Sequence, residues 1–422
     1  MHSAFRSIGC GLLVWNFLWA AVSFALDPSS QIKSVAVYST FAECKNKGHR
    51  STWCTYNYFQ DKKKTEQFLN KILPEKDSLD FDDFFIASFS IGDRSFSEFI
   101  CERYLHKQEI TLVIDAGAVE SELEEKLAKA CPGKSGIAKN ILKLGGGGKA
   151  SEWNIQHVKF WTFKNKKTGM YTLIFGTGNA TSGSFTHTFN SWISLVTSAN
   201  TGIFKQHACL KGSLIAAAKV FTEGKSKELS KSAFVDEMRR CRKENNIGTF
   251  EQSLREEGIA AMFPPMPEDA VDKRIVRVVD DLKAGQELLG ASQYFTSRDL
   301  GSALTRAVKR GVKVRIVLED DNLHDESPYM NSSKRSAEFY KRSLKQSGAD
   351  FRFVETNEKI HQVMHQKFLI AGGLIITGSG QFSFAAQTSN YENFYFINNE
   401  KIIREYKLIF EKLWKAGYKD PS

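Results

Sequence analysis

Two His-x-Lys pairs are the residues of this chain whose type and spacing could do chemistry. His157 is followed by Lys159, and His365 is followed by Lys367, with one residue between the members of each pair. An imidazole can act as a nucleophile or exchange a proton near neutral pH, and an ammonium group can hold an anionic oxygen. Because residues i and i+2 of a strand share a face, each pair would project side by side. The repeat predicts one phosphate site assembled from two halves of the chain.

A turn rich in glycine and hydroxyl residues follows each pair, after a second β-like run. The two turns are Gly176-Thr177-Gly178-Asn179 and Gly378-Ser379-Gly380-Gln381. Turns of this composition let backbone N–H groups approach an anion closely. We expect the non-bridging phosphate oxygens to be held by two ammonium groups, two amides and two hydroxyls, those of Lys159, Lys367, Asn179, Gln381, Thr177 and Ser379.

The two motifs together resemble the repeated signature of the phospholipase D superfamily, which is His-x-Lys, four residues, Asp, and then a Gly-Ser/Thr-x-Asn turn. The resemblance covers most of the chain beyond its N-terminal apolar stretch. The signature Asp positions hold Lys164 and Gly372, and Gln381 stands where the second turn usually has Asn. That Asp is generally a structural partner, and the branch that includes the tyrosyl-DNA phosphodiesterases lacks it. Its loss therefore need not abolish catalysis.

The resemblance also implies a polar partner for each histidine from the opposite half. Glu392 is expected to orient His157, and Asn190 is expected to face His365. A carboxylate fixes the tautomer of an imidazole and stabilises its cationic form. We therefore expect His157 to be the nucleophile that forms a phosphohistidine, and His365 to be the general acid. This chemistry is phosphodiester hydrolysis or transfer, and it needs no metal and no cofactor.

The elements that must position the motifs alternate between strand and helix in both halves. The β-like runs and the helix-like stretch between them lie at 84–89, 95–105 and 110–115 before the first motif, and at 288–295, 300–309 and 312–318 before the second. The alternation predicts the α/β class, with two similar α/β/α sandwich halves related by pseudo-twofold symmetry and the active site at their interface. A Pro-rich segment at 263–269 predicts a first domain at 26–262 and a second at 263–422.

Residues 1–25 are typical of a signal peptide. Arg6 precedes an apolar stretch that ends at Ala25, where cleavage is expected. A retained membrane anchor is the alternative, because the stretch is barely long enough to span a bilayer. A signal peptide predicts export, with the protein periplasmic or secreted.

The cysteines agree with export. Six remain beyond the signal peptide, namely Cys44, Cys54, Cys101, Cys131, Cys209 and Cys241. An even number fits disulfides in an oxidising compartment, and all six lie in the first half. Cys44 with Cys54 is the easiest pairing, although six cysteines permit fifteen connectivities.

His361 and His365 could share a helix face as zinc ligands, but their surroundings favour a strand, so no metal is predicted.

The formal net charge of +10 favours an anionic partner. A phospholipase D would act on phospholipid headgroups and could dock on an anionic membrane surface, which would make this a monomeric enzyme of lipid degradation. A nuclease would bind nucleic acid along the same basic groove. A degenerate phosphate-binding module is a third option, supported by Lys164, Gly372 and Gln381. We favour the lipid substrate because simple exported nucleases of this family often carry a single motif and dimerise.

The acidic segment 319–334 is expected to be a surface loop.

Overall fold

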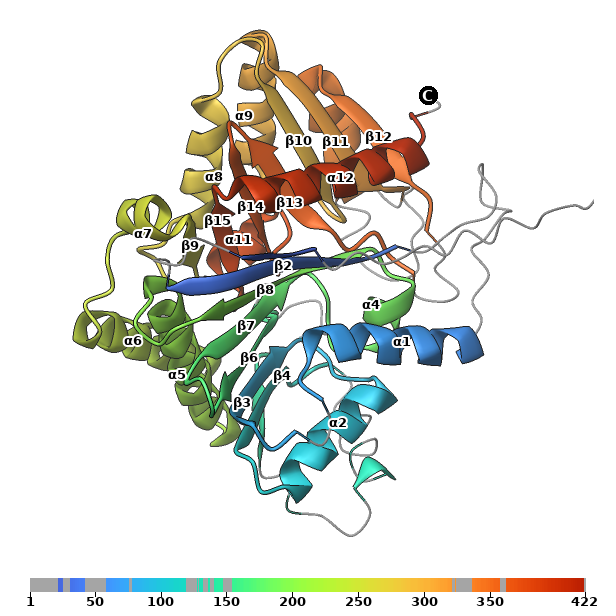
Figure 1. Ribbon diagram of the computed structural model, residues 1–422. Coiled ribbons are helices and arrows are strands. Elements are labelled where there is room, and N and C mark those ends of the chain that lie inside the picture. Colours follow the sequence, from blue (N-terminus) through green and yellow to red (C-terminus); the bar gives the residue numbers. More distant parts are fainter. Residues whose placement is uncertain are drawn as a thin grey trace, which may run out of the picture.

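The fold was examined in a computed structural model (Figure 1). It describes residues 22–25, 31–41, 58–75, 78–118, 127, 129–131, 136, 140–146, 154–320, 323, 336–356 and 362–420. Two sheets, one per half, stand one above the other in Figure 1, and helices cover them.

The first half is built on an eight-stranded mixed sheet in the order β1-β2-β8-β7-β6-β3-β4-β5. Its strands are β1 (Val22–Ala25), β2 (Ile32–Thr40), β3 (Phe81–Ser88), β4 (Ile110–Asp115), β5 (Ile141–Leu144), β6 (Phe160–Asn165), β7 (Tyr171–Gly176) and β8 (Asn190–Thr197). β3 and β4 run parallel, since the chain returns between them through helix α2 (Arg94–Leu105).

The second half is built on a seven-stranded mixed sheet in the order β12-β11-β10-β13-β14-β15-β9. Its strands are β9 (Ile259–Met262), β10 (Glu287–Ser292), β11 (Lys313–Glu319), β12 (Asp350–Val354), β13 (Lys367–Ala371), β14 (Leu374–Gly378) and β15 (Phe394–Ile397). β10 and β11 run parallel, and helix α9 (Arg298–Lys309) crosses between them.

The two sheets share one order of six strands. The series β8-β7-β6-β3-β4-β5 corresponds position by position to β15-β14-β13-β10-β11-β12. In each half, the strand that follows the His-x-Lys pair runs antiparallel to the strand that leads into the glycine turn. This correspondence confirms the predicted α/β class with two similar halves.

Helices cover both faces of each sheet. α1 (Tyr58–Ile72) and α2 close one face of the first sheet, and α8 (Val271–Asp280) and α9 close one face of the second. On the other faces lie α5 (Gly202–Thr222), α6 (Lys227–Glu244) and α12 (Glu400–Ala416), whose apolar side chains join both sheets in one shared core. α7 (Phe250–Glu257) packs beside β9. Each half is therefore a sandwich, and the shared core holds the halves together.

The helices begin where the sequence supplies a capping side chain. Asp93, Thr201, Ser226, Ser297 and Asn399 each accept hydrogen bonds from backbone N–H groups at the start of α2, α5, α6, α9 and α12. A cap of this kind satisfies a donor that the helix itself leaves without a partner. Local sequence thus fixes where these five helices begin, whereas α8 begins without a side-chain cap.

The domain boundary differs from the one predicted from the Pro-rich segment. β9 lies in the second sheet, paired antiparallel with β15. Its four residues are buried and apolar, so the edge of that sheet, rather than the proline content, decides where the second half starts. The second half therefore includes residues 259–262, which the prediction gave to the first.

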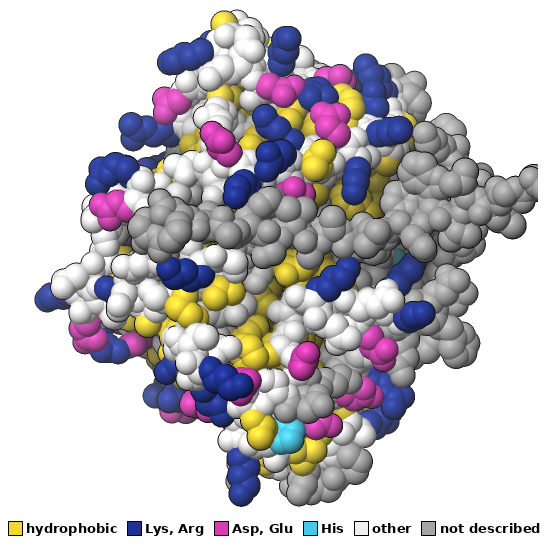
Figure 2. Space-filling view, in the orientation of Figure 1, with side chains coloured by type: hydrophobic (Ala, Val, Ile, Leu, Met, Phe, Trp, Pro, Cys, Tyr) yellow, Lys and Arg dark blue, Asp and Glu magenta, His cyan; other side chains and the backbone are white. Residues whose placement is uncertain are grey.

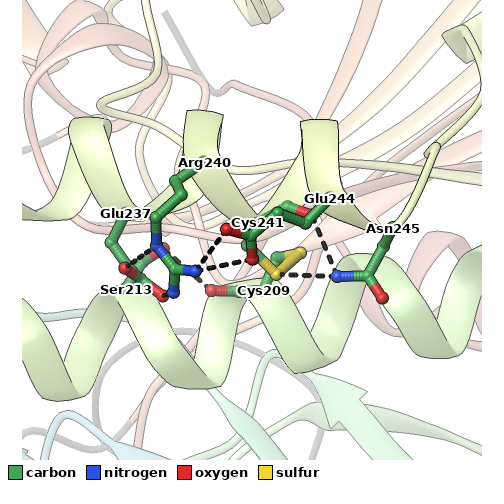
Figure 3. Close-up of a disulfide and its surroundings, with 7 residues drawn as sticks. All are labelled: Cys209, Ser213, Glu237, Arg240, Cys241, Glu244 and Asn245. Carbon is green, nitrogen blue, oxygen red and sulfur yellow. Dashed lines mark hydrogen bonds and ion pairs between the residues drawn. A yellow bond between two sulfur atoms is a disulfide. The ribbon is translucent and has the colours of Figure 1, made fainter.

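Two disulfides lie in the first half. Cys101 bonds to Cys131, and Cys209 on α5 bonds to Cys241 on α6 (Figure 3). Cys44 and Cys54 lie outside the described residues, and so does most of the predicted signal peptide, apart from the four residues of β1 that pair with β2. Among the described residues, no helix combines the length and the apolar character needed to cross a membrane.

Candidate active site

The His-x-Lys pairs lie at the start of their strands rather than inside them. Lys159 directly precedes β6, Lys367 is the first residue of β13, and each histidine lies two residues earlier in irregular chain. In both pairs the Lys Nζ donates to the backbone oxygen of its own histidine, at 3.0 Å from Lys159 and 2.9 Å from Lys367. The predicted strand positions are thus corrected by a few residues, because these segments pair with the opposite half instead of with a sheet neighbour.

That pairing is seen at His157. Its backbone N–H donates to the Tyr391 carbonyl at 2.9 Å, and the Tyr391 N–H donates to the Ile155 carbonyl at 2.9 Å. The Asn393 side chain accepts from the Lys159 N–H at 3.1 Å and donates to the Lys159 carbonyl at 3.2 Å. The segment after the second glycine turn therefore holds the first His-x-Lys segment.

The two histidine rings face each other between the halves. The ring centroids of His157 and His365 are 6.4 Å apart, and the ring planes are nearly perpendicular, at 85°. Glu392 accepts from His157 Nδ1, with both carboxylate oxygens at 3.0 Å. Asn190 Oδ1 accepts from His365 Nδ1 at 2.9 Å. Each imidazole is therefore oriented by a side chain of the other half.

With its Nδ1 proton directed at Glu392, His157 is held as the tautomer whose Nε2 carries a lone pair. Nε2 has no hydrogen-bond partner within the part of the chain that the structure describes. Phe89 packs edge-on to the same ring, with centroids 5.5 Å apart. A neutral, oriented imidazole with an unengaged lone pair is a competent nucleophile.

Thr177 and Ser379 lie behind the site rather than in it. The Thr177 hydroxyl donates to Asn190 Oδ1 at 3.1 Å, and the Ser379 hydroxyl donates to Glu392. Both residues are completely buried. Their predicted role as phosphate-binding hydroxyls is corrected: they hold the groups that orient the histidines.

The two turn amides differ from each other. Gln381 donates to Gln293 Oε1 at 2.9 Å and accepts from the Ser292 hydroxyl and the Tyr294 N–H, both at 3.3 Å. Asn179 has a side-chain oxygen with no hydrogen-bond partner. The extra methylene turns the Gln381 amide into its own half, so its predicted contact with phosphate is not available in this conformation, and the predicted contact of Asn179 stays a prediction.

Burial sets the protonation of the site. It lowers the pKa of His157 to about 4, against the opposing charge of Glu392. It also lowers the pKa of Lys159 to about 7, and it brings those of His365 and Lys367 well below their usual values. For Glu392, burial opposes ionisation, but His157 and Lys159 outweigh it and lower the pKa of the carboxyl. The site by itself thus has a carboxylate and neutral imidazoles near neutral pH.

Two buried carboxylates near the site were not predicted as site residues. Asp115 ends β4 and Glu319 ends β11, and Glu319 is completely buried, so it is not part of the surface loop expected at 319–334. The rest of that segment lies outside the described residues, apart from Asp320 and Leu323. The sequence did carry a signal, since an acidic residue ends the corresponding strand in both halves.

Groups of three or more potential metal ligands do not occur within the described ranges, and His361 lies outside them.

Parts of this chain are similar in sequence to known proteins. A family model described as "Cardiolipin synthase, PLD-like domain" matches residues 280–414. The mitochondrial cardiolipin hydrolase of Danio rerio is 30% identical over 129 residues, which are 30% of this chain and 50% of that protein. The protein of the same name from Chlamydomonas reinhardtii is 28% identical over 120 residues, 28% of this chain and 47% of the relative. The matches thus span about half the length of these curated relatives.

The phosphatidylserine synthase of Haemophilus influenzae shares the fold over both halves. Its crystal structure covers 85% of this chain and 86% of its own, with a TM-score of 0.53 and 11% identity. The family model covers the second half only, whereas this likeness in fold covers both halves.

Proposed function

Because this chain belongs to the phospholipase D superfamily, we propose that it is a phosphodiesterase that cleaves or exchanges phospholipid headgroups through a phosphohistidine on His157. The observation that carries the proposal is the pair of facing imidazoles, 6.4 Å apart and each oriented from the opposite half. A phosphoryl group between the rings would meet a nucleophile on one side and an acid on the other.

The first step forms a bond between His157 Nε2 and phosphorus while the bond from phosphorus to the leaving oxygen breaks. His365 gives its proton to that oxygen, and the headgroup alcohol departs. In the second step, water or another alcohol gives a proton to His365, and its oxygen attacks phosphorus and displaces His157. Two displacements in line return the phosphodiester or phosphomonoester with retained configuration.

The substrate supplies the charge that the empty site lacks. A phosphodiester anion between the halves favours the cationic forms of Lys159, Lys367 and His365, and so raises pKa values that burial lowers. Glu392 stabilises the positive charge that develops on His157 as the phosphorus bond forms. Binding and proton uptake are therefore coupled, and His365 is loaded as an acid when the substrate is present.

A lipid substrate is favoured over nucleic acid. The matching relatives are named as cardiolipin hydrolases, the family model as a cardiolipin synthase domain, and the enzyme that shares the fold as a phosphatidylserine synthase. Among the described residues on the face seen in Figure 2, Lys and Arg lie interspersed with Asp and Glu instead of forming one continuous basic track. We further propose that the protein acts after export, as the N-terminal apolar stretch predicts.

The test is to incubate the protein with vesicles of cardiolipin or phosphatidylcholine, in EDTA and with added ethanol. We expect phosphatidic acid from hydrolysis and phosphatidylethanol from transfer, and a phosphorylated peptide that contains His157 after rapid quenching. His157→Ala should lose at least 1,000-fold in rate, by analogy with loss of a nucleophile.

His106→Ala is the matched control, because His106 is exposed and follows α2, away from the site. It should keep full activity. A single-stranded DNA oligonucleotide is assayed beside the vesicles. Cleavage of the DNA alone would replace the lipid by a nucleic-acid substrate. No His157-dependent product from any of the substrates would support the degenerate phosphate-binding module.

A further inference from the structure

The positions of the signature Asp hold no carboxylate in this fold. Lys164 lies near the end of β6, over the ring of Tyr171 at 5.8 Å. Gly372 lies in the turn between β13 and β14, with a φ of +57°. These positions cannot supply an anionic partner to the site. The two halves must stabilise their His-x-Lys segments in another way.

Each half has a completely buried carboxylate at one matching place. Asp115 is the last residue of β4, and Glu319 is the last residue of β11. These two strands occupy the same position in the shared order of six. A carboxylate is costly to bury unless it is hydrogen-bonded or paired, so its presence at both places calls for specific partners.

Their partners include the main-chain groups directly before the two histidines, beside the Gly117 N–H for Asp115 and the Thr356 hydroxyl for Glu319. Asp115 Oδ2 accepts from the N–H of Gln156 at 2.8 Å. Glu319 Oε1 accepts from the N–H of Met364 at 3.0 Å. The longer Glu side chain makes the same bond in the second half that Asp makes in the first. The same interaction therefore occurs twice, one residue ahead of His157 and of His365.

The two carboxylates also act on the lysines of their own halves. Burial disfavours the charged form of Lys159, whereas Glu392 and Asp115 favour it and raise its pKa. For Lys367, burial and the charge of Lys159 lower the pKa, whereas Glu392 and Glu319 raise it. Glu392 is shared between the halves, but Asp115 and Glu319 each serve one.

We propose that Asp115 and Glu319 are positioning residues, one in each half, that fix the main chain before the catalytic histidine and place a buried negative charge beside the His-x-Lys segment of their own half. They would thereby supply the structural anion that the signature positions lack. This inference rests on the proposed function and deepens it, since it assigns two further residues to the same site.

Two kinds of variant separate the two effects. Asp115→Asn and Glu319→Gln keep the size and an acceptor oxygen but remove the charge. Asp115→Ala and Glu319→Ala remove the acceptor as well. Asp269→Asn is the matched control, because Asp269 is also a buried carboxylate but pairs with Arg242 at 2.7 Å and accepts from the Phe263 N–H, not from the residue before either histidine.

The first readout is amide hydrogen exchange, which does not depend on activity. Asp115→Ala should speed exchange at Gln156 by about tenfold and leave Met364 unchanged, and Glu319→Ala should do the reverse. Equal exchange at both amides in the variants and the parent would overturn the positioning role. If the alanine variants do not fold, the exchange rates are compared in Asp115→Asn and Glu319→Gln. Each should speed exchange at the amide of its own half only, by less than the alanine variant would.

The second readout is the pH profile of kcat/KM on bis(p-nitrophenyl) phosphate. Asp115→Asn and Glu319→Gln should each move the alkaline limb to lower pH by about one unit, because a lysine loses its proton more easily without the nearby anion. Asp269→Asn should leave the limb in place. An unmoved limb in both site variants would overturn the charge role. A parent without activity would instead reject the proposed function, and the exchange data would still decide the positioning role.

Discussion

Glu392 and Asn190 make the two histidines chemically unequal, although the halves place the rings alike. In the proposed mechanism, a carboxylate beside His157 would stabilise the imidazolium that forms as this ring bonds to phosphorus. An amide oxygen beside His365 orients the ring without adding charge, so His365 would give up its proton more readily. The difference supports the proposal that the nucleophile lies in the first half and the acid in the second.

Replacing these two side chains tests that assignment. Glu392→Gln should slow formation of the phosphohistidine by about 10- to 100-fold, because it keeps the size of the side chain and loses the charge. Asn190→Ala should slow protonation of the leaving group. The loss of rate relative to the parent should therefore be smaller for a substrate whose leaving group needs no proton, such as p-nitrophenolate. Both are measured by rapid-quench kinetics. The opposite pattern, with Asn190→Ala slowing the attack on every substrate, would exchange the roles of the two histidines.

At the scale of elements, the site depends on contacts that cross between the halves. The first His-x-Lys segment is held by Tyr391 and Asn393, which follow the second glycine turn. In the reverse direction, the Phe189 N–H donates to the Val363 carbonyl at 3.0 Å. Helices α5 and α6 support this arrangement from behind, through the core that both sheets share. Neither half would present its histidine correctly alone.

The disulfide between α5 and α6 should affect stability and leave the chemistry intact. It closes a separation of 32 residues, and removing it frees the unfolded chain. We expect Cys209→Ser with Cys241→Ser to lower the free energy of unfolding by about 2 to 4 kcal/mol, measured by urea denaturation. Activity at a temperature where both proteins are folded should be equal. Lost activity with an unchanged unfolding transition would mean that the bridge shapes the site.

At the scale of the whole molecule, three histidines are buried with lowered pKa values. Burial lowers the pKa of His157 and of His207 to about 4, and that of His365 well below its usual value. His207 lies outside the site, where its Nε2 contacts the Tyr395 hydroxyl at 2.7 Å. The folded protein keeps these rings neutral under conditions where the unfolded chain binds protons.

The protein should therefore lose stability in mild acid. The unfolded histidines take up protons as the pH falls below 6.5, while folded His157 and His207 do so only near 4, so the free energy of unfolding falls between these values. Each ring with a pKa near 4 accounts for roughly 3 kcal/mol when the loss is complete. Urea unfolding at several pH values measures the slope. His207→Gln should make the slope of the unfolding free energy against pH shallower, and His106→Ala should leave that slope unchanged. A flat dependence from pH 6.5 to 4 would contradict the burial of these rings as neutral groups.

The sequence by itself determined the two motifs and the class of fold, and it indicated the resemblance to the phospholipase D superfamily. Strand periodicity, the capping residues and the spacing of His, Lys and glycine are local properties, so they can be recognised without contacts. The partners Glu392 and Asn190 could be named in advance only because the resemblance supplied a pattern for them. The cysteine positions also placed the disulfides in the first half, but not their connectivity.

Only the tertiary structure decided which polar groups face the substrate and which lie behind it. Thr177 and Ser379 turn away to hold Asn190 and Glu392, and Gln381 bonds within its own half. The sheet edge at β9 set the domain boundary. An acidic residue at the end of both strands was a signal in the sequence, but only the fold showed that Asp115 and Glu319 occupy matching places and bond to the segments before the histidines. Hydrogen bonds between separate segments of the chain leave no local pattern, because their energy depends on the folded arrangement of both partners.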